Sequence, residues 1–370
     1  MKKVILEGCN GEWAQKCYLP ILIGEAAKGE IELWAVDIGN KIELNSPEIE
    51  KEWQVTQNKG KACYLNKSKD TQNYRELSNA DFVFVVAPDQ FHSKIATFWL
   101  DRLAPQGKVF IEKPLDASVG AARKLKVKIE ETGEDTVFAF DHYLARAYPF
   151  LRHKDYYLKE IGGVEKIEFH ILEASEIPPE RVKALDKGMV FDLFGHVLAL
   201  VCAVVNQNLT YSATKLRAVK LEKVKAARYV GSPIAEETLA QIKFIINNDI
   251  EVVSAVGKCV GTSEDKFMKL YGPNGRIELN FRPRGSKFCV FDSQGRQVKE
   301  KELDSNPVES FLKEVLQGKK HPLSIPGILS FDAAFEILTI LDEAKKQISK
   351  VPEYQCGNSI GKILERLKER

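Results

Sequence analysis

The sequence has no strong charge of either sign, and it lacks the cysteine patterns of disulfide-linked or zinc-binding proteins. Its 54 lysines and arginines nearly balance 52 aspartates and glutamates, and no basic tract interrupts that balance. Nothing therefore favours nucleic acid or an anionic membrane surface as a partner, and small molecules are the expected ligands. The 7 cysteines are an odd number without a CxxC pair, which argues against a disulfide framework or a zinc site and indicates a reducing compartment.

Long apolar runs are also missing near the N-terminus. The apolar run after the first two lysines ends at Glu7, and it is too short for a signal peptide or a membrane-spanning helix. We therefore expect a cytoplasmic protein. Its 370 residues suit two domains, at about 150 residues per domain, with room for a ligand-binding cleft.

Two different sequence patterns divide the chain. The first part alternates short β-branched runs with helical patterns, which is typical of a parallel α/β sheet. Its predicted strands lie at 4–6, 31–36, 82–86, 109–111 and 137–140. From about Val164 the pattern is that of a mostly antiparallel sheet, flanked by helices at 190–205, 307–317 and 330–347. We predict a Rossmann domain over 1–140 and an α+β domain with a large open sheet over 141–370, whose C-terminal segment can pack back on the first.

The end of the first strand has the glycine pattern of a dinucleotide site. Gly8 and Gly11 lie in GCNGEWA, where glycine lets the backbone approach a pyrophosphate and a helix start supplies free N–H groups. The alternative is a plain strand-to-helix turn. Asp37 ends the second strand and can accept the ribose hydroxyls of NAD, which favours NAD over NADP. Asp37 can instead begin a turn with Gly39, and Lys41 nearby could permit NADP.

Polar residues also follow the later strands. Ala87-Pro88-Asp89-Gln90-Phe91-His92 follows one strand, and Glu112-Lys113-Pro114 ends the next. Proline after Lys113 fixes an extended backbone and raises the odds of a cis bond, which would direct the lysine toward the reacting hydroxyl. The alternative for Lys113 is a solvated surface charge.

Two clusters in the second domain are candidate substrate sites. If a helix begins after Tyr143, then His142, Tyr143 and Arg146 can converge on a phosphate while Asp141 points elsewhere; the alternative is a helix cap. Asp192 and His196 stand four apart in an apolar helix, so they share a face and need a partner or a substrate. A hydrogen-bonded core histidine is the alternative.

Taken together, these motifs resemble the glucose-6-phosphate dehydrogenase family. The resemblance is carried, in order, by GCNGEWAQKCYLPIL, VAPDQFHSKIATFW, IEKP, FDHYLAR, FDLFGHVLALV, ARYVGSP with TLAQIKFIINN and AVGK, and the tail VPEYQCGNSIG.

An overlapping resemblance is to the Gfo/Idh/MocA oxidoreductases, through APDQFH, EKP, the Asp192/His196 pair and the segment from NPVESF to ILDEA. The Asp192 to His196 spacing matches this second family, and the length of 370 residues lies nearer to it, because glucose-6-phosphate dehydrogenases usually run longer. Glucose-6-phosphate dehydrogenases are expected to have a basic residue for NADP after the second strand. This sequence has Asp37 and its neighbours there instead.

The resemblance implies a role for each site residue. His196 would be the general base, Asp141 would orient it, and Lys113 would contact the reacting hydroxyl. The substrate contacts would be His142, Tyr143, Arg146, Glu173, Asp192 and Lys258. The residues expected at the cofactor are Gly8, Asn10, Gly11, Glu12, Trp13, Asp37, Ala87, Pro88, His92, Glu112 and Lys113.

The expected activity is hydride transfer between a sugar or sugar-phosphate hydroxyl carbon and NAD or NADP. One alternative is a Gfo/Idh/MocA-type dehydrogenase or ketoreductase of an unphosphorylated sugar or cyclitol. Another is a dinucleotide-binding regulator without turnover, although such a protein would not need both Lys113 and His196. By analogy with both families we expect a homo-oligomer.

Overall fold

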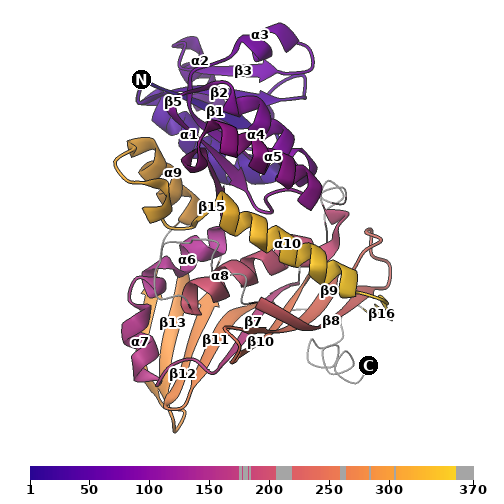
Figure 1. Ribbon diagram of the computed structural model, residues 1–370. Helices are drawn as coiled ribbons and strands as arrows, with labels where there is room; N and C mark the ends of the chain where they lie inside the picture. The colour runs from indigo at the N-terminus through magenta and orange to yellow at the C-terminus, as the bar shows by residue number, and fades with distance from the viewer. Residues whose placement is uncertain are drawn as a thin grey trace. The chain divides into compact units, whose positions relative to one another are not determined.

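The chain forms two compact units (Figure 1), and a computed structural model describes residues 1–174, 177, 182, 185–205, 219–258, 264–282, 285–303 and 306–355. The first unit comprises Met1–Phe140 and Val308–Phe335, and the second comprises Asp141–Pro307 and Glu336–Arg370. No helix of the described residues is both long enough and apolar enough to cross a membrane.

The first unit is built on a seven-stranded sheet with the order β15-β6-β5-β4-β1-β2-β3. Its strands are parallel except β15, which pairs antiparallel with β6. The strands are β1 (Lys2–Glu7), β2 (Ile31–Asp37), β3 (Ala62–Asn66), β4 (Ala80–Val85), β5 (Leu103–Glu112), β6 (Val137–Phe140) and β15 (Ile328–Ser330). The helices are η1 (Ala14–Tyr18), α1 (Leu19–Ala27), α2 (Pro47–Asn58), α3 (Thr71–Glu76), η2 (Asp89–Phe91), α4 (His92–Leu100), α5 (Val119–Thr132), η3 (Glu134–Thr136), α9 (Pro307–Gln317) and η8 (Pro322–Ser324).

A column of aromatic rings holds α9 on the first sheet. Phe311 of α9 stacks on Phe140 of β6 with ring centroids 4.0 Å apart, and its edge meets Phe110 of β5 and Phe84 of β4. All four rings are buried, and burying a phenylalanine contributes about 1.5–3 kcal/mol. From the sequence, helix 307–317 is predicted to flank the second sheet, but these rings attach it to the first unit.

The second unit contains a nine-stranded sheet with the order β14-β13-β12-β11-β7-β10-β9-β8-β16. Most pairs are antiparallel, whereas β7 with β10 and β8 with β16 are parallel. The strands are β7 (Lys166–Glu173), β8 (Val219–Tyr229), β9 (Leu239–Ile246), β10 (Ile250–Lys258), β11 (Asp265–Gly272), β12 (Gly275–Phe281), β13 (Ser286–Asp292), β14 (Gln297–Leu303) and β16 (Glu353–Tyr354). The helices are α6 (His142–Leu151), α7 (Lys154–Glu160), η6 (Val190–Phe194), α8 (Gly195–Val205) and α10 (Phe331–Gln347), of which α10 begins in the first unit.

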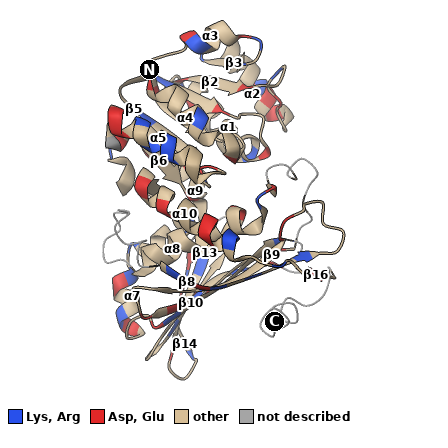
Figure 2. Cartoon of the chain, turned by 45° about the vertical axis from the view of Figure 1, so that its right-hand side comes forward, with Lys and Arg blue, Asp and Glu red and all other residues tan. Residues whose placement is uncertain are grey.

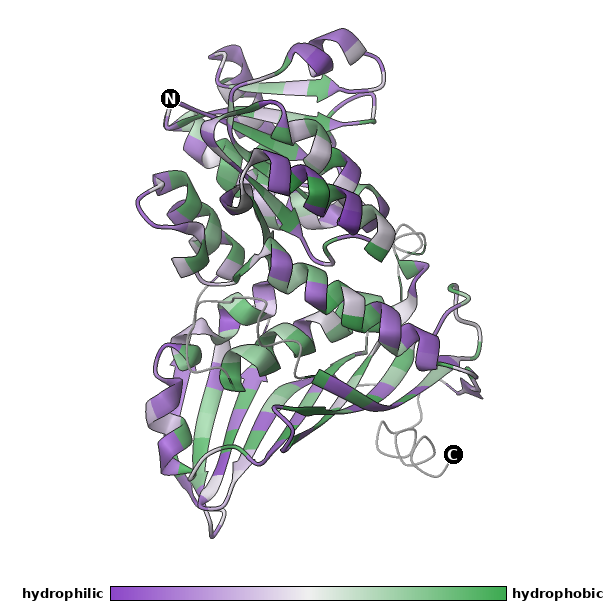
Figure 3. Cartoon of the chain, in the orientation of Figure 1, coloured by the Kyte–Doolittle hydropathy of each residue, from purple (hydrophilic) through white to green (hydrophobic). Residues whose placement is uncertain are grey.

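Residues along the strands of the second sheet alternate between hydrophobic and hydrophilic (Figure 3), because one face packs against helices. Phe244 of β9, for example, meets Phe194 of η6 with ring centroids 5.7 Å apart. On the helices of both units, charges of both signs are interspersed, in agreement with the small net charge (Figure 2).

Several strands were missed from the sequence: β3, β8, β14, β15 and β16. Strand β8 alternates, but with lysine and glutamate on one face and small or apolar residues on the other, which weakens its hydrophobic signal. Of the tail VPEYQCGNSIG, only Val351 to Gln355 fall within the described residues. None of the five described cysteines forms a disulfide, and Cys259 and Cys356 lie outside the described residues.

Candidate active site

In the first unit, the turn after β1 leaves no room for a side chain at Gly8. Its φ is +84°, and a Cβ there would lie 2.5 Å from the backbone nitrogen of Ala87. The Gly8 amide donates to the carbonyl of Val36 (2.9 Å), and the Gly11 amide donates to the carbonyl of Gly8 (3.1 Å). The helical segment then begins at Glu12. The neighbouring backbone therefore requires glycine at this position, and this glycine cradle leads directly into a helix start, a combination that suits a pyrophosphate.

Asp37 is held by the same turn. Its Oδ2 accepts a hydrogen bond from the Asn10 amide (2.9 Å), and its Oδ1 accepts one from the Ile38 amide (2.6 Å). The Asn10 side chain accepts from the Glu43 amide and donates to the carbonyl of Lys41. The predicted ribose-binding carboxylate is thus fixed in place, and each of its oxygens keeps a second lone pair for a ligand hydroxyl.

Glu112 and Trp13, both predicted to contact cofactor, also bind each other. Glu112 is 6% exposed, and its Oε1 accepts hydrogen bonds from the Trp13 indole (2.9 Å) and the Tyr18 hydroxyl. Burial and the neighbouring carboxylate raise the pKa of Tyr18, so its hydroxyl stays a donor. These bonds fasten the end of β5 to the segment that follows the glycine turn.

The side chain of His92 connects the segments that follow β4 and β5. It is buried, with Nδ1 2.8 Å from the carbonyl of Pro114 and Nε2 2.6 Å from the carbonyl of Ala87. Both ring nitrogens thus face protein carbonyls, so they are not available to a cofactor. The Lys113-Pro114 peptide between these segments is cis.

In the second unit, Asp141 links a helix start to a buried histidine. Asp141 follows β6 directly and is the N-cap of α6, where its Oδ1 accepts from the Leu144 amide at 2.9 Å. Its Oδ2 lies 2.7 Å from Nδ1 of His196 on α8, and both side chains are almost fully buried. Because the carboxylate accepts, Nδ1 carries a proton, and whenever the ring is neutral Nε2 is its basic nitrogen.

His142, Tyr143 and Arg146 gather near the same histidine. The ring centroids of His142 and Tyr143 lie 4.6 and 4.7 Å from that of His196, and the Arg146 guanidinium lies over the Tyr143 ring at 5.3 Å. The helix begins at His142 rather than after Tyr143, and Asp141 points to His196 rather than away from the cluster. Tyr143 is buried, and burial raises its pKa, so it stays protonated.

Asp192 has a different partner from His196. Lys258 of β10 is 4% exposed, and its ammonium lies 3.2 Å from Asp192 and 3.1 Å from Glu173 of β7. Lys266 forms ion pairs with both Glu173 (3.1 Å) and Glu264 (3.1 Å). Burial acts to raise the pKa of Glu173, but the two ammonium groups outweigh it and hold that pKa below its usual range.

Lys266 was not singled out from the sequence, because nothing in EDKFMKL distinguishes its lysines. Glu237 was missed as well. Its buried carboxylate accepts from the Val190 amide (3.0 Å) and binds Lys345 of α10, and it occupies the space that a Cβ on Gly188 would need. Glu237 therefore caps the helical segment that carries Asp192 and His196. One of two adjacent glutamates after a turn gives no such signal in the sequence.

Comparison with known proteins supports this interpretation of the first unit. Residues 41–140 match the model of the Gfo/Idh/MocA oxidoreductase family with an NAD-binding Rossmann fold. No curated protein matches the chain.

Solved structures match nearly the whole chain at low sequence identity. Glucose-6-phosphate 1-dehydrogenase from Mycobacterium avium has a TM-score of 0.72 and 16% identity, over 96% of this chain and 94% of that one. A variant of KijD10, a 3-ketoreductase from Actinomadura kijaniata in complex with TDP-benzene and NADP, has a TM-score of 0.68 and 11% identity, over 95% and 99%. UDP-N-acetylglucosamine 3-dehydrogenase GnnA from Acidithiobacillus ferrooxidans has a TM-score of 0.62 and 13% identity, over 94% of this chain and 97% of that one.

These matches confirm the two predicted resemblances and the predicted fold class, a Rossmann unit plus an α+β unit with a mostly antiparallel sheet. The family match over residues 41–140 agrees with the predicted class of protein, an NAD(P)-dependent oxidoreductase. The mycobacterial dehydrogenase is matched over 94% of its length, so a length of 370 residues does not by itself exclude a resemblance to glucose-6-phosphate dehydrogenases. The roles of individual site residues stay predictions.

Proposed function

We propose that this protein oxidises a hydroxyl carbon of a sugar or sugar phosphate, or reduces the corresponding ketone or lactone, with His196 as the general base or acid. The observation that carries the proposal is the buried 2.7 Å contact between His196 Nδ1 and Asp141 Oδ2. A buried carboxylate that orients an imidazole is the arrangement of a positioned base.

The first unit would hold the dinucleotide. The cradle at Gly8 and the helix start at Glu12 suit its pyrophosphate, and Asp37 suits unmodified ribose hydroxyls, which supports NAD over NADP. When bound, the nicotinamide accepts or donates the hydride. Lys113, at the end of β5, would donate a hydrogen bond to the reacting oxygen.

In the direction of oxidation, Nε2 of His196 would take the proton of the substrate hydroxyl. The imidazole then becomes a cation, and the carboxylate of Asp141 stabilises it across the 2.7 Å contact. The same carboxylate holds the ring in the tautomer that presents a basic Nε2. In the reverse direction His196 would return this proton to the oxygen.

His196→Asn tests the assignment. Because a positioned base contributes roughly 10² to 10⁴ in rate, kcat should fall by about 10² or more. His170→Asn is the matched control, since His170 of the same unit also has a carboxylate partner, Asp265, at 3.0 Å and should leave kcat unchanged. Unchanged turnover in His196→Asn would refute the role.

A second candidate is an unphosphorylated sugar. It is favoured by the ion pairs of Lys258 with Asp192 and of Lys266 with Glu173, which already match these cations with carboxylates. Arg146→Ala separates the two: a higher KM for phosphorylated substrates alone supports a phosphate clamp of His142, Tyr143 and Arg146, whereas no change supports the neutral sugar. If no sugar or sugar phosphate changes the spectrum of bound NADH, the third alternative, a dinucleotide-binding regulator without turnover, is favoured instead.

A further inference from the structure

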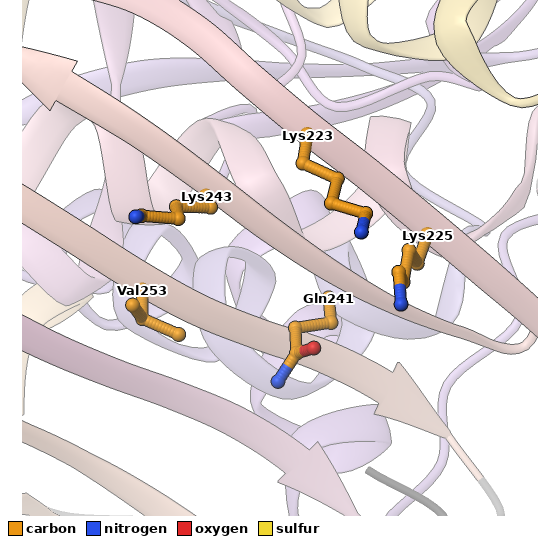
Figure 4. A pocket seen from close by; sticks show the side chains of 5 residues that line it. All are labelled: Lys223, Lys225, Gln241, Lys243 and Val253. Carbon is orange, nitrogen blue, oxygen red and sulfur yellow. The ribbon is translucent and has the colours of Figure 1, made fainter. Parts of the chain in front are cut away.

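A lysine-lined cavity in the second unit and the buried ring of His92 in the first unit both lie outside the proposed chemistry. The cavity has a volume of about 190 Å³, and its lining side chains, which come from β8, β9 and β10, are half-buried or exposed (Figure 4). They are Lys223, Lys225, Gln241, Lys243 and Val253. Such lysines are ordinary solvated charges, and Lys243 already pairs with Glu251 at 2.8 Å. His92, in contrast, is 2% exposed, so its polar contacts require an explanation.

The ring of His92 joins the two segments that follow the neighbouring strands β4 and β5. Its Nε2 lies 2.6 Å from the carbonyl oxygen of Ala87, and its Nδ1 lies 2.8 Å from that of Pro114. Ala87 is the backbone against which Gly8 packs, because a Cβ on Gly8 would lie 2.5 Å from the Ala87 nitrogen. Pro114 directly follows Lys113. One buried ring therefore connects the backbone beside the glycine turn to the backbone beside Lys113.

Lys113 also has an anchored residue on its other side. Glu112 is buried, and its Oε1 accepts hydrogen bonds from the Trp13 indole (2.9 Å) and the Tyr18 hydroxyl. The residues immediately before and after Lys113 are thus both held by buried side chains of other segments. The main chain of Lys113 is fixed at two points, which limits the positions that its ammonium group can reach.

We propose that His92 is a positioning residue, which sets the place of Lys113 relative to the bound dinucleotide. The inference rests on the role of Lys113 in the proposed function and adds the residue that places this lysine. The bond from Nδ1 to the Pro114 carbonyl would fix the main chain beside Lys113. The bond from Nε2 to the Ala87 carbonyl would tie it to the glycine turn. Because a displacement of about 1 Å can cost about 10² in rate, the Nδ1 bond should affect turnover.

Two substitutions of similar size separate these bonds. The amide nitrogen of asparagine lies near the position of Nδ1 and that of glutamine near the position of Nε2, and both are donors. His92→Asn can therefore keep the bond to Pro114, whereas His92→Gln can keep only the bond to Ala87. Both variants should fold, because Asp116 ties the same segments independently by accepting from the amides of Ser93 (3.0 Å) and Ser118 (2.9 Å).

The kinetic test uses glucose 6-phosphate, or the first sugar of a panel that turns over. We expect kcat to fall by about tenfold to 10²-fold in His92→Gln and by less than about threefold in His92→Asn. Ser93→Ala is the matched control, since the Ser93 hydroxyl makes no hydrogen bond within the described part of the chain, and it should leave kcat unchanged. Equal kcat values for His92→Gln and His92→Asn would overturn the proposal.

A double-mutant cycle shows whether His92 acts through Lys113. If it does, adding His92→Gln to Lys113→Ala should lower kcat by less than about twofold beyond Lys113→Ala alone, because coupled residues are not additive. If the two effects multiply, His92 has only a general structural role and the proposal is overturned.

Hydrogen exchange of the protein without nucleotide or sugar gives a readout that does not depend on turnover. The amides of residues 115–118 should exchange faster in His92→Gln than in His92→Asn or Ser93→Ala. Equal exchange in all three variants would overturn the inference, while a loss of kcat in His196→Asn would leave the proposed function standing. If His196→Asn instead keeps its kcat, the proposed function fails, and faster exchange in His92→Gln alone would still support the anchoring of the Lys113 segment by His92.

Discussion

Asp141→Asn separates two roles of one carboxylate. Oδ1 of Asp141 caps α6 through the Leu144 amide at 2.9 Å, and Oδ2 accepts the proton of His196 Nδ1 at 2.7 Å. Asparagine is also a good N-cap, so its oxygen can keep the bond to Leu144. Its NH₂ group then faces His196, which must accept at Nδ1 and carry its proton on Nε2. The ring is then in the wrong tautomer to act as a base.

The expected magnitudes follow from these two bonds. Losing the positioned base should lower kcat by about 10² to 10⁴. Stability should change by only about 1 kcal/mol, because both hydrogen bonds have replacements. Asp141→Ala loses the cap and leaves a buried ring unsatisfied, so it should cost about 2–4 kcal/mol in addition to the lost activity.

The assay is steady-state kinetics at saturating nucleotide, together with urea denaturation of the wild type and both variants. A kcat for Asp141→Asn within a few fold of the wild type would refute the tautomer argument. An equal loss of stability in Asp141→Asn and Asp141→Ala would refute the capping argument.

Three further substitutions test other parts of the structure. Gly8→Ala should cost about 1–3 kcal/mol in denaturation and weaken nucleotide binding, whereas Gly24→Ala, where no atom lies within 4 Å, should be neutral or stabilising. The pKa of Glu173 is lower in the folded protein than in the unfolded chain, so its charge stabilises the fold above the unfolded-state pKa, and this stability is lost as the pH falls through the folded-state pKa. Glu173→Gln should therefore make the free energy of unfolding depend less on pH on the acid side. An unchanged pH dependence would contradict this. Burial raises the pKa of Glu237 despite the nearby Lys345, so the folded state binds the proton of this carboxyl more tightly than the unfolded chain does. Glu237→Gln should therefore become more stable relative to the wild type as the pH rises above about 4.3. The opposite trend would exclude a net cost of burying this charge.

Much of the fold follows from local pattern. The alternation of strands and helices over the first 140 residues predicts the Rossmann sheet, and six strands of the second sheet are recognised by their period of two. Gly8 is also predictable, because only glycine fits a turn with positive φ against a neighbouring strand. Polar residues that end parallel strands meet at one edge, which is why Asp37 is recognisable.

The partners of the buried polar groups were less predictable. From spacing alone, Asp192 and His196 form one pair, but in the structure Asp192 binds Lys258 and His196 binds Asp141, 55 residues earlier. A π-helical turn at 190–194 precedes His196, and the helical period of 3.6 does not anticipate it. The resemblance to known families, not the spacing, led to Asp141.

The sequence by itself determined the class of each unit, the glycine cradle and the strand ends that carry polar side chains, because each depends on neighbours within a few residues. Only the tertiary structure decided that α9 packs on the first sheet, that Glu237 caps the segment bearing His196, and that lysines of two strands meet in one cavity. Those contacts join residues far apart in the chain, and they form because buried rings and charges must find complementary surfaces, which periodicity does not encode.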